Sequence, residues 1–401
     1  MKLEDGIQYA IDVVKGNIVV CNYVRLACQH FLNFLEDKHW EYEFVADYVD
    51  HFLFFTKTLK HTKGADAGKP LELQPFQILL ICAIYGFRDK KDPTHRMVQD
   101  VILFIPRKAS KSTLIAIIGL YELRFGEAGG EVYCTALDRN QASIVFDTAK
   151  GMIQGMPEQL KAQYSTYRHE IKKAADSQSK FQALSRDSKR TGDGKNPSVS
   201  IVDEAAQITE RNSIEVMNSG MVARKNPLRI YLTTASFTKE TKFFEDLSHF
   251  RQILRGAAED NGHWFGLSYS IDPGDNWKDP VTWGKANPML GVSVTVEAIQ
   301  HMADEAASKP ASLNEFLCKQ LNIYVSANTA WLDRTYWDES IGVKGEEPEA
   351  VFMAFDLAHS RDLNAVCTLF RFGEEDLYSK FQFFLPEDSL GFIPNHYLSI
   401  Y

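Results

Sequence analysis

Apolar residues recur at helical spacing through the first 60 positions of the chain. The segments LACQHFLNFLEDK (26–38) and WEYEFVADYVDHFLFFTKTL (40–59) place them three and four residues apart, which is the repeat of a helix with one buried face. A polar, glycine-containing break, HTKGADAGKP (61–70), follows before LQPFQILLICAIYGF (73–87) resumes as an apolar helix. The pattern predicts a helical N-terminal segment over residues 1–65.

The pattern changes after residue 97 to short apolar runs separated by helical stretches. Four runs have the composition of buried strands: VQDVILFIP (98–106), EVYCTA (131–136), SVSIVDEA (198–205) and LRIYLTTAS (228–236). STLIAIIGLYELRFG (112–126) and DRNQASIVFDTAKGMIQGM (138–156) are helical in pattern. Strands that alternate with helices indicate an α/β fold with a parallel sheet, buried on both faces. We expect this domain to span residues 66–245.

Two further segments follow this domain. Residues 246–345 are rich in helix formers, tryptophan and turn residues, and we expect a helical linker or lid subdomain there. VFMAFDLAHSRDLNAVCTLFRF (351–372) then has the pattern of two strands around a polar turn, and DLYSKFQFFLP (376–386) adds a third. We therefore expect residues 346–401 to form the start of a second α/β domain.

Length and charge narrow the class of protein. A chain of 401 residues is too long for one ordinary domain, and its longest apolar runs are too short to cross a bilayer. No apolar signal region follows Met1, so we expect a cytosolic protein without membrane contact. Six scattered cysteines contain no CxxC pair, which speaks against structural zinc. The net charge of −9 excludes a surface covered with nucleic-acid contacts.

One segment is locally basic. Residues 168–195 hold eight Lys and Arg side chains against four Asp and Glu, a net charge of +4. A solvated charged loop explains this composition, and so does a loop that faces DNA or nucleotide phosphate. Both readings stay open at this point.

The stretch IPRKASKSTLIA (105–116) contains the parts of a phosphate-binding loop. A strand, a short basic loop and the start of a helix bring backbone N–H groups to phosphate oxygens. Lys111 would neutralise the β- and γ-phosphates of ATP, and Ser112 or Thr113 would offer a hydroxyl to Mg²⁺. Arg107 and Lys108 add positive charge beside the loop. A Lys-Ser-Thr triplet alone is also an ordinary helix start, so its context decides.

That context lies about 90 residues downstream, where SVSIV ends in Asp203 and Glu204. Adjacent carboxylates at the end of a buried strand are costly unless a metal or hydrogen bonds use them. Asp203 can hold Mg²⁺ through water, and Glu204 can act as the general base on the attacking water. The usual loop has glycine directly before its lysine and again five residues earlier. Those positions here hold Ser110 and Ile105, and we expect Ser110 to cost strain of about 1 kcal/mol.

Taken together, these motifs resemble the large terminase subunit of tailed bacteriophages, an ATPase–nuclease that packages DNA into procapsids. PRKASKS is similar to the loop of that family, IVDEA to its second ATPase motif and LTTAS to its coupling motif. LELQPFQ matches the adenine-side motif, with Gln77 at the glutamine position. WGKANPMLG (283–291), FLCKQLNIYV (316–325) and AWL (330–332) resemble its linker signatures, and FDLAHSRDLNAV (355–366) its RNase H-like nuclease. The resemblance runs from about residue 20 to about 388.

The resemblance implies roles for single residues. Thr234 would sense the γ-phosphate and couple hydrolysis to motion, and Ser110 would stand in the ATP-binding loop. Arg139 matches an arginine finger that serves a neighbouring subunit, although a capping or surface arginine fits equally well. Asp356 would be the first nuclease metal ligand, with Asp362 as a supporting carboxylate and Mg²⁺ or Mn²⁺ as the metal. The implied partners are double-stranded viral DNA, portal protein, the small terminase subunit and further copies in a pentameric ring, docked transiently on a procapsid in the host cytoplasm.

Departures from the family pattern limit this interpretation. A two-metal nuclease needs carboxylates from at least two separated segments. Only Asp356 and Asp362 lie in the part that resembles the family, and the later strands that would supply the others are absent. LGFIPNHYLSIY (390–401) does not resemble the charged helix expected there, so we expect an incomplete, nuclease-deficient domain and a truncated or altered C-terminus. Because Ser110 replaces glycine, a P-loop scaffold that binds DNA or portal without hydrolysing ATP is the alternative function. A helicase-like enzyme is disfavoured, since the linker signatures and the nuclease start replace a second motor-like sheet.

Overall fold

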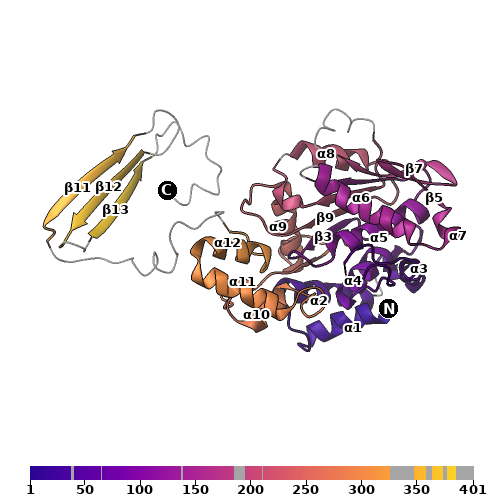
Figure 1. Cartoon of the computed structure of the whole chain (residues 1–401), viewed down its shortest axis with the longest axis horizontal. Helices are drawn as coiled ribbons and strands as arrows, with labels where there is room; N and C mark the ends of the chain where they lie inside the picture. Colours follow the sequence, from indigo (N-terminus) through magenta and orange to yellow (C-terminus); the bar gives the residue numbers. More distant parts are fainter. Residues whose placement is uncertain are drawn as a thin grey trace. The chain divides into compact units, whose positions relative to one another are not determined.

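The computed structural model describes residues 1–37, 40–64, 66–136, 139–184, 195–209, 211–325, 347–357, 364–373 and 377–384. The chain divides into two compact units, Met1–Trp331 and Leu332–Tyr401, and each is described by itself (Figure 1). In the described part of the chain no helix is long and apolar enough to cross a membrane.

The N-terminal segment is helical, as its apolar spacing predicts. Helices α1 (Leu3–Val14), α2 (Asn22–Glu36) and α3 (Ala46–Thr56) precede α4 (Pro75–Ile81), which continues into the π-helical turn η1 (Cys82–Gly86). The exception is β1 (Tyr42–Phe44), which pairs antiparallel with β2 (Phe87–Asp89). These helices pack beside the large sheet rather than apart from it: the ring of Phe31 in α2 lies 6.2 Å from that of Phe265 in the sheet.

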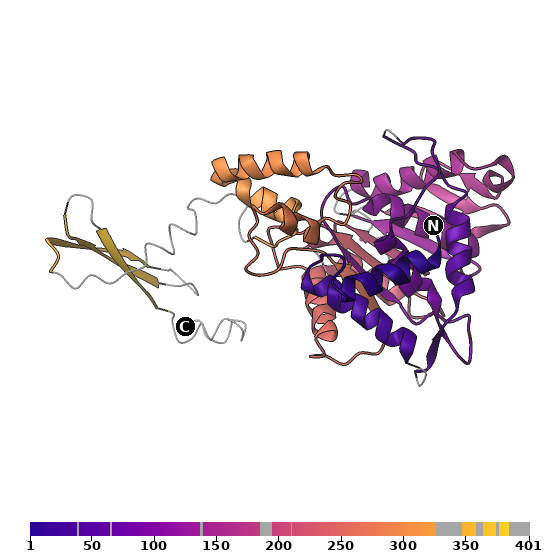
Figure 2. The same ribbon diagram turned by 90° about the horizontal axis from the view of Figure 1, so that it is seen from below.

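An eight-stranded sheet forms the centre of the first unit, in the order β10–β3–β9–β8–β4–β7–β6–β5. The strands predicted from apolar runs are β3 (Asp100–Phe104), β4 (Glu131–Thr135), β8 (Val199–Asp203) and β9 (Leu228–Thr233). They run parallel, as expected. Helices α5 (Lys111–Phe125) and α6 (Arg139–Gln154) pack side by side against β4 and β7 (Figures 1 and 2). Close packing there requires Gly119, because a Cβ at this position would meet the Phe181 ring at 2.8 Å.

The strand order decides which loops can meet. β9 lies between β3 and β8, so the carboxyl-terminal ends of these three strands are neighbours. The phosphate-loop candidate follows β3, the Asp203-Glu204 pair ends β8, and LTTAS ends β9. Parallel strands bring their carboxyl-terminal ends to the same side of the sheet, which is the usual place of a ligand site in such sheets.

Both edges of the sheet hold strands that the sequence interpretation missed. β5 (Tyr164–Thr166), β6 (Glu170–Lys173) and β7 (Asp176–Leu184) extend one edge, with antiparallel pairing among them. The interpretation of residues 168–195 as one loop is therefore wrong for its first half. On the other edge, β10 (Trp264–Ser268) pairs with β3 beyond the expected domain boundary at residue 245. Alternating polar residues in β5–β7 obscured their strand character, since only one face is buried.

Helices lie between and after the last strands of the first unit. α8 (Arg211–Gly220) and α9 (Lys242–Leu254) lie against the sheet, while α10 (Pro280–Ala286), α11 (Val296–Ser308) and α12 (Pro310–Lys319) form a subdomain. Its small core is centred on the fully buried Trp283 and includes Ile299 and Phe316. Within the expected linker segment, residues 280–319 thus contain three helices, whereas β10 belongs to the large sheet.

The second unit contains the three strands that the sequence predicts. β11 (Ala350–Asp356), β12 (Asn364–Arg371) and β13 (Leu377–Phe384) pair antiparallel in this order. Asp356 is the last residue of β11.

Candidate nucleotide site

The loop after β3 leads directly into a buried helix. α5 begins at Lys111, and apart from its first turn most of its side chains are buried. Ser110 precedes it with φ +56° and ψ +24°, the left-handed conformation that glycine adopts without strain. Lys108 also has a positive φ, +65°. The conformation explains why glycine is usual at the position of Ser110 and why serine is strained but tolerated there.

Lys111 points back into its own loop. Its Nζ donates hydrogen bonds to the carbonyl oxygens of Ile105 (3.1 Å) and Pro106 (2.8 Å) and to Oγ1 of Thr234 (2.9 Å). An ammonium group has three donors, so all of them are used within the chain. Burial lowers the pKa of Lys111 to about 8, against the opposing effect of Glu204 and Asp203. Any phosphate that binds Lys111 must compete with these acceptors.

Thr234 joins the phosphate loop to β9. Its hydroxyl accepts from Lys111 and donates to the Ile105 carbonyl at 3.1 Å, and the side chain is 1% exposed. The neighbouring Thr233 accepts from the backbone N–H of Ala206, just after β8, at 3.2 Å. Successive threonines of LTTAS therefore contact both motifs that flank β9.

Asp203 and Glu204 stand at the end of β8, as predicted. Burial raises the pKa of Asp203 to about 6, the Glu204 charge adds to this, and the Lys111 ammonium opposes it. The backbone N–H of Glu204 donates to Oδ1 of Asp203 at 2.9 Å. A buried carboxylate with a raised pKa beside a second carboxylate is an arrangement that a divalent cation stabilises. The Asp203 carboxylate therefore fits Mg²⁺. The half-buried hydroxyl of Ser112, in the first turn of α5, is a second oxygen donor of the kind that Mg²⁺ binds.

Glu204 has a strained backbone. Its φ is +51°, which is uncommon for a residue with a Cβ and is often found at functional sites. Its Oε2 accepts from Nε2 of Gln207 at 3.2 Å, which fixes the carboxylate. The strain and the anchoring suit a base that must be held in one orientation.

The helical subdomain contributes residues that the sequence interpretation did not assign. The backbone N–H of Arg107 donates to the Lys319 carbonyl at 3.3 Å, and Oγ of Ser293 donates to the Lys108 carbonyl at 2.7 Å. Lys319 Nζ donates to the carbonyl of Ala235, directly after Thr234, at 2.9 Å. The phosphate loop and the coupling motif are thus both bonded to the subdomain.

Asn322 makes two buried hydrogen bonds from a left-handed backbone conformation, and one of them joins the subdomain to the site. Its Oδ1 accepts from the Ala235 N–H at 2.7 Å, and its Nδ2 donates to the Tyr269 carbonyl at 2.6 Å. The residue is 1% exposed and has φ +58°, a conformation that asparagine tolerates better than most residues. Lys319 and Asn322 lie in FLCKQLNIYV, so the motif was recognised but its chemistry was not.

The remaining predicted residues lie in several environments. Thr113 is half-buried in the first turn of α5, and Arg107 and Lys108 are exposed. Gln77 is buried, and its Oε1 accepts from the Gln74 N–H at 2.9 Å, so it caps α4. The geometry adds no contact of Gln77 with the phosphate loop, and its adenine role stays a prediction.

Three predictions fall partly outside the described residues. Arg139 begins α6, but its side chain is not described, and Asp362 lies outside the described residues. Asp356 is described, but among the described residues no three His, Cys, Asp or Glu side chains gather as a metal site. In the basic segment, Lys172 and Lys180 pair with Glu170 (3.2 Å) and Glu131 (3.1 Å), and residues 185–194 are outside the description.

Comparison with known proteins identifies the family. The model of the terminase large subunit ATPase domain matches residues 75–252, and that of the terminase large subunit endonuclease domain matches residues 258–397. The chain belongs to the large terminase subunit family. The endonuclease match extends beyond residue 388, so the expectation that the C-terminal stretch leaves the family pattern is wrong. A loss of nuclease activity stays a prediction.

Individual relatives agree with this assignment. The terminase large subunit of Enterobacteria phage HK97 is 27% identical over 80% of this chain and 62% of its own length. The protein YmfN of Escherichia coli K12 is 34% identical over 47% of this chain and 42% of its own. The crystal structure of the HK97 large terminase matches 86% of this chain and 69% of its own with a TM-score of 0.57 and 23% identity, which supports the fold. The chain spans about 42 to 62% of the length of these curated relatives.

Proposed function

We propose that this chain is the ATP-hydrolysing subunit of a motor that moves double-stranded viral DNA into a procapsid. The observation that carries the proposal is that Lys111, Thr234 and the Asp203-Glu204 pair lie together at the carboxyl-terminal ends of β3, β9 and β8, beside the N-terminus of α5. These groups supply charge neutralisation, a metal site and a base, which phosphoryl transfer to water requires.

The hydrogen bonds of Lys111 suggest how binding of ATP changes the site. The phosphates of ATP bind at the first turn of α5 and draw the Lys111 ammonium away from Ile105, Pro106 and Thr234. The Thr234 hydroxyl loses the Lys111 contact, and it donates to the γ-phosphate once its single O–H turns away from the Ile105 carbonyl. Arg107, Lys108 and Ser110 line the loop, while Gln77 lies on the adenine side.

Hydrolysis then uses the carboxylates of β8. Asp203, with the hydroxyl of Ser112 or Thr113, would hold Mg²⁺, which neutralises charge on the phosphate oxygens. Glu204 accepts a proton from the attacking water, and its strained backbone and the Gln207 contact hold it in position. Arg139 of a neighbouring copy stabilises the charge of the transition state in a homo-oligomeric ring, which we take to be a pentamer.

Motion follows from the links between the site and the helical subdomain. Because Ala235 bonds to both Lys319 and Asn322, any shift of Thr234 toward phosphate pulls on the subdomain. The partners that fit this motor are portal protein, the small terminase subunit and DNA, met in the host cytoplasm on the procapsid. In the C-terminal unit Asp356, with Asp362, would hold Mg²⁺ or Mn²⁺ for DNA cleavage, an activity that we expect to be lost here.

Release of phosphate from ATP tests the proposal. Wild type should release phosphate in the presence of DNA, whereas Lys111→Ala should fail to bind ATP and Glu204→Gln should bind it without turnover. If wild type released phosphate no faster than both variants, the alternative of a non-hydrolysing scaffold would be favoured. The strained backbone of Ser110 is the structural reason for that alternative.

A further inference from the structure

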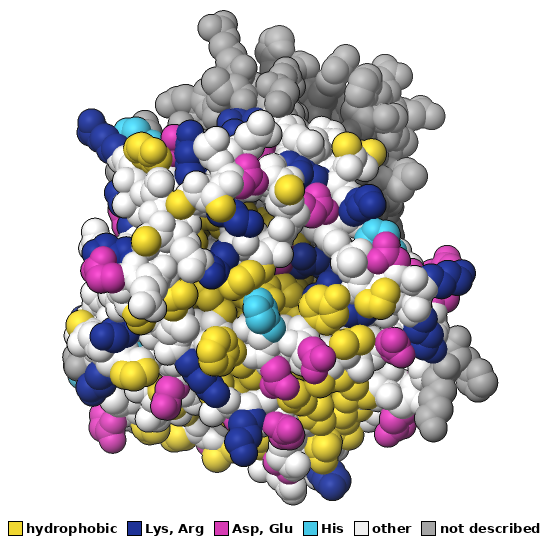
Figure 3. Space-filling model, turned by 90° about the vertical axis from the view of Figure 1, so that its right-hand side faces the viewer, with side chains coloured by type: hydrophobic (Ala, Val, Ile, Leu, Met, Phe, Trp, Pro, Cys, Tyr) yellow, Lys and Arg dark blue, Asp and Glu magenta, His cyan; other side chains and the backbone are white. Residues whose placement is uncertain are grey.

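A cavity lies at the amino-terminal ends of the parallel strands, whereas the nucleotide site lies at their carboxyl-terminal ends. Its volume is about 780 Å³, and its walls come from α3, η1, the end of α5 and the segments before β8 and β9. Glu122 in this wall is 11 residues along α5 from Lys111, about 16 Å at the rise of a helix. Figure 3 shows the hollowed face, where hydrophobic side chains lie beside basic ones.

Two arginines lie next to each other in this cavity, and only one of them is paired with a carboxylate. Arg88 and Arg96 are partners in an antiparallel bridge and are 4% and 6% exposed. Like charges directly opposite one another are destabilising. Arg96 is neutralised by Glu122, with Nη1 and Nη2 at 3.0 and 3.1 Å from its carboxylate oxygens. Arg88 has no carboxylate within ion-pair distance among the described residues.

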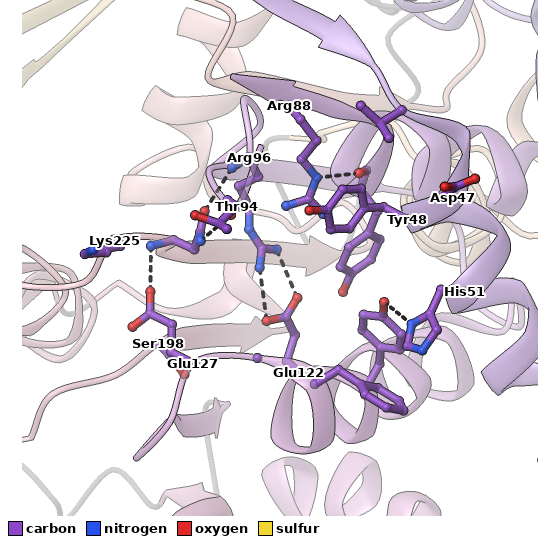
Figure 4. A pocket seen from close by; sticks show the side chains of 16 residues that line it. Asp47, Tyr48, His51, Arg88, Thr94, Arg96, Glu122, Glu127, Ser198 and Lys225 are labelled. Atoms are coloured by element: carbon purple, nitrogen blue, oxygen red, sulfur yellow. Dashed lines mark hydrogen bonds and ion pairs between the residues drawn. The ribbon is translucent and has the colours of Figure 1, made fainter. Parts of the chain in front are cut away.

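The surroundings of Arg88 leave its outer nitrogens available. Nε donates to the carbonyl oxygen of Tyr85 at 2.9 Å, and the guanidinium lies 3.8 Å from the centre of the Tyr48 ring. For the Nη groups, no acceptor is found in the part of the chain that the structure describes. Figure 4 shows the Arg88 guanidinium beside Tyr48, with Asp47 on the far side of that ring. Burial and the charge of Arg96 lower the pKa of Arg88 to about 10.

The other acidic residues of the cavity do not offset Arg88. Glu127 accepts from the Asn226 N–H at 2.7 Å and lies 3.5 Å from Arg224, and Asp47 is exposed. A second buried donor, Nε of Arg96, also has no partner among the described groups. Glu122, which is paired with Arg96, opposes the lowering of the Arg88 pKa only from a distance. Buried charges in proteins are normally paired, so a buried arginine that faces a cavity without a carboxylate at ion-pair distance indicates an anion site.

The cavity walls define the rest of the ligand. A bare oxyanion would leave most of the volume empty, whereas cavities of this size hold organic ligands. The apolar walls are largely aromatic and include Tyr48, Tyr85, Tyr121 and Phe125. The planar fork of arginine matches carboxylate and phosphate oxygens two at a time.

We propose that this cavity binds an organic oxyanion, a carboxylate or phosphate joined to an aromatic body, with the oxyanion on Arg88 and the ring among Tyr48, Tyr121 and Phe125. The site is separate from the nucleotide site and does not depend on ATP hydrolysis.

Calorimetric titration of the full chain with benzoate, phenyl phosphate, benzamide and inorganic phosphate tests the proposal, in the absence of nucleotide. Benzoate and phenyl phosphate should bind, and benzamide and inorganic phosphate should bind at least about tenfold more weakly. The separation from the nucleotide site predicts equal binding by the Lys111→Ala variant. Competition by ATP would instead place these ligands at the phosphate loop and overturn the assignment.

Variants locate the anion. Arg88→Gln should lose at least about tenfold in affinity for phenyl phosphate, while Arg255→Gln, an exposed arginine on α9's end, should not change it. If Arg88→Gln does not fold, Arg88→Lys replaces it in the experiment, because it keeps the positive charge. The loss of the planar guanidinium should still weaken binding severalfold. Binding that is equal in wild type and Arg88→Lys, or equal for benzamide and benzoate, would overturn the proposal.

Discussion

The Nζ of Lys111 lies 2.9 Å from Oγ1 of Thr234, and the two residues are 123 positions apart in sequence. The contact exists because β9 is inserted between β3 and β8, which places the end of LTTAS beside the phosphate loop. The same hydroxyl donates to the Ile105 carbonyl, so Thr234 contacts both the lysine and its loop. One buried hydroxyl thus connects the loop after β3 to the end of β9, whose next residue, Ala235, is bonded to Lys319 and Asn322.

Replacing Thr234 should separate ATP binding from turnover. Thr234→Val removes an acceptor of Lys111 and the donor to Ile105 but keeps the shape of the side chain. We expect the KM for ATP to change by less than about threefold and kcat to fall at least about tenfold, because the contact to the γ-phosphate is lost in the transition state. Steady-state phosphate release measures both.

The control for this experiment is Thr234→Ser, which retains the hydroxyl and should keep most of the activity. A Thr234→Val enzyme with unaltered kcat would show that the hydroxyl has no part in coupling.

Substitutions at Ser110 should follow backbone conformation rather than polarity. Glycine adopts φ +56° without strain, so Ser110→Gly should keep or raise ATPase activity and change the free energy of unfolding by no more than about 1 kcal/mol. A β-branched residue is strongly disfavoured there, so Ser110→Val should destabilise by about 1–3 kcal/mol.

Urea denaturation and phosphate release together check this prediction. A collapse of Ser110→Gly to the level of Lys111→Ala would mean that the serine hydroxyl itself is required.

Asp203 predicts a pH dependence of stability. Its pKa is raised in the folded protein from 3.8 to about 6, so the native state binds more protons than the unfolded state between these values. The contribution of Asp203 to stability therefore falls as pH rises through this window, and the cost is fully present above pH 6. Asp203→Asn should stabilise the metal-free protein little at pH 4 and by up to about 3 kcal/mol at pH 7.

Denaturation of wild type and Asp203→Asn at several pH values without Mg²⁺ or nucleotide measures this difference. The same gain at pH 4 and pH 7 would show that the buried charge is not its source. Excess Mg²⁺ should reduce the gain at pH 7, since the cation stabilises the ionised aspartate alone.

Asn322 should be required for both stability and turnover. Asn322→Ala removes two buried hydrogen bonds and places alanine at φ +58°, so we expect a loss of about 2–4 kcal/mol. Because Ala235 also loses its acceptor, kcat should fall more than the KM for ATP rises. Asn17→Ala, which removes an exposed bond to Asp12, should stay within about 0.5 kcal/mol of wild type.

Thermal unfolding and phosphate release on the two asparagine variants give the comparison. If Asn322→Ala matched Asn17→Ala in both, the subdomain would not be coupled to the site through Ala235.

Much of the fold could be predicted from the sequence, because buried parallel strands are continuous apolar runs. The runs that end in Phe104, Asp203 and Thr233 were identified on this basis, and the motifs after them gave most of the site. β5–β7 were missed because their side chains are partly solvated, and β10 because the tryptophan and glycine in WFGLS fit no simple period.

The rest of the site depends on contacts that local patterns do not encode. Lys319 and Asn322 act through backbone groups of Ala235, and no spacing rule relates positions more than 80 residues apart. The left-handed backbone of Ser110 could be inferred from the glycine usual there, but that of Glu204 could not, because nothing in IVDEA signals it. The Arg88 cavity forms from segments whose charges look like ordinary surface positions in sequence.

The most direct test of the motor is a single-turnover and steady-state measurement of phosphate release on wild type, Lys111→Ala and Glu204→Gln, with double-stranded DNA present. We predict turnover by wild type, no detectable ATP binding by Lys111→Ala, and tight ATP binding with at least about a hundredfold lower kcat for Glu204→Gln. Equal rates for wild type and Glu204→Gln would contradict the assignment of Glu204 as the base and, with it, the proposed motor.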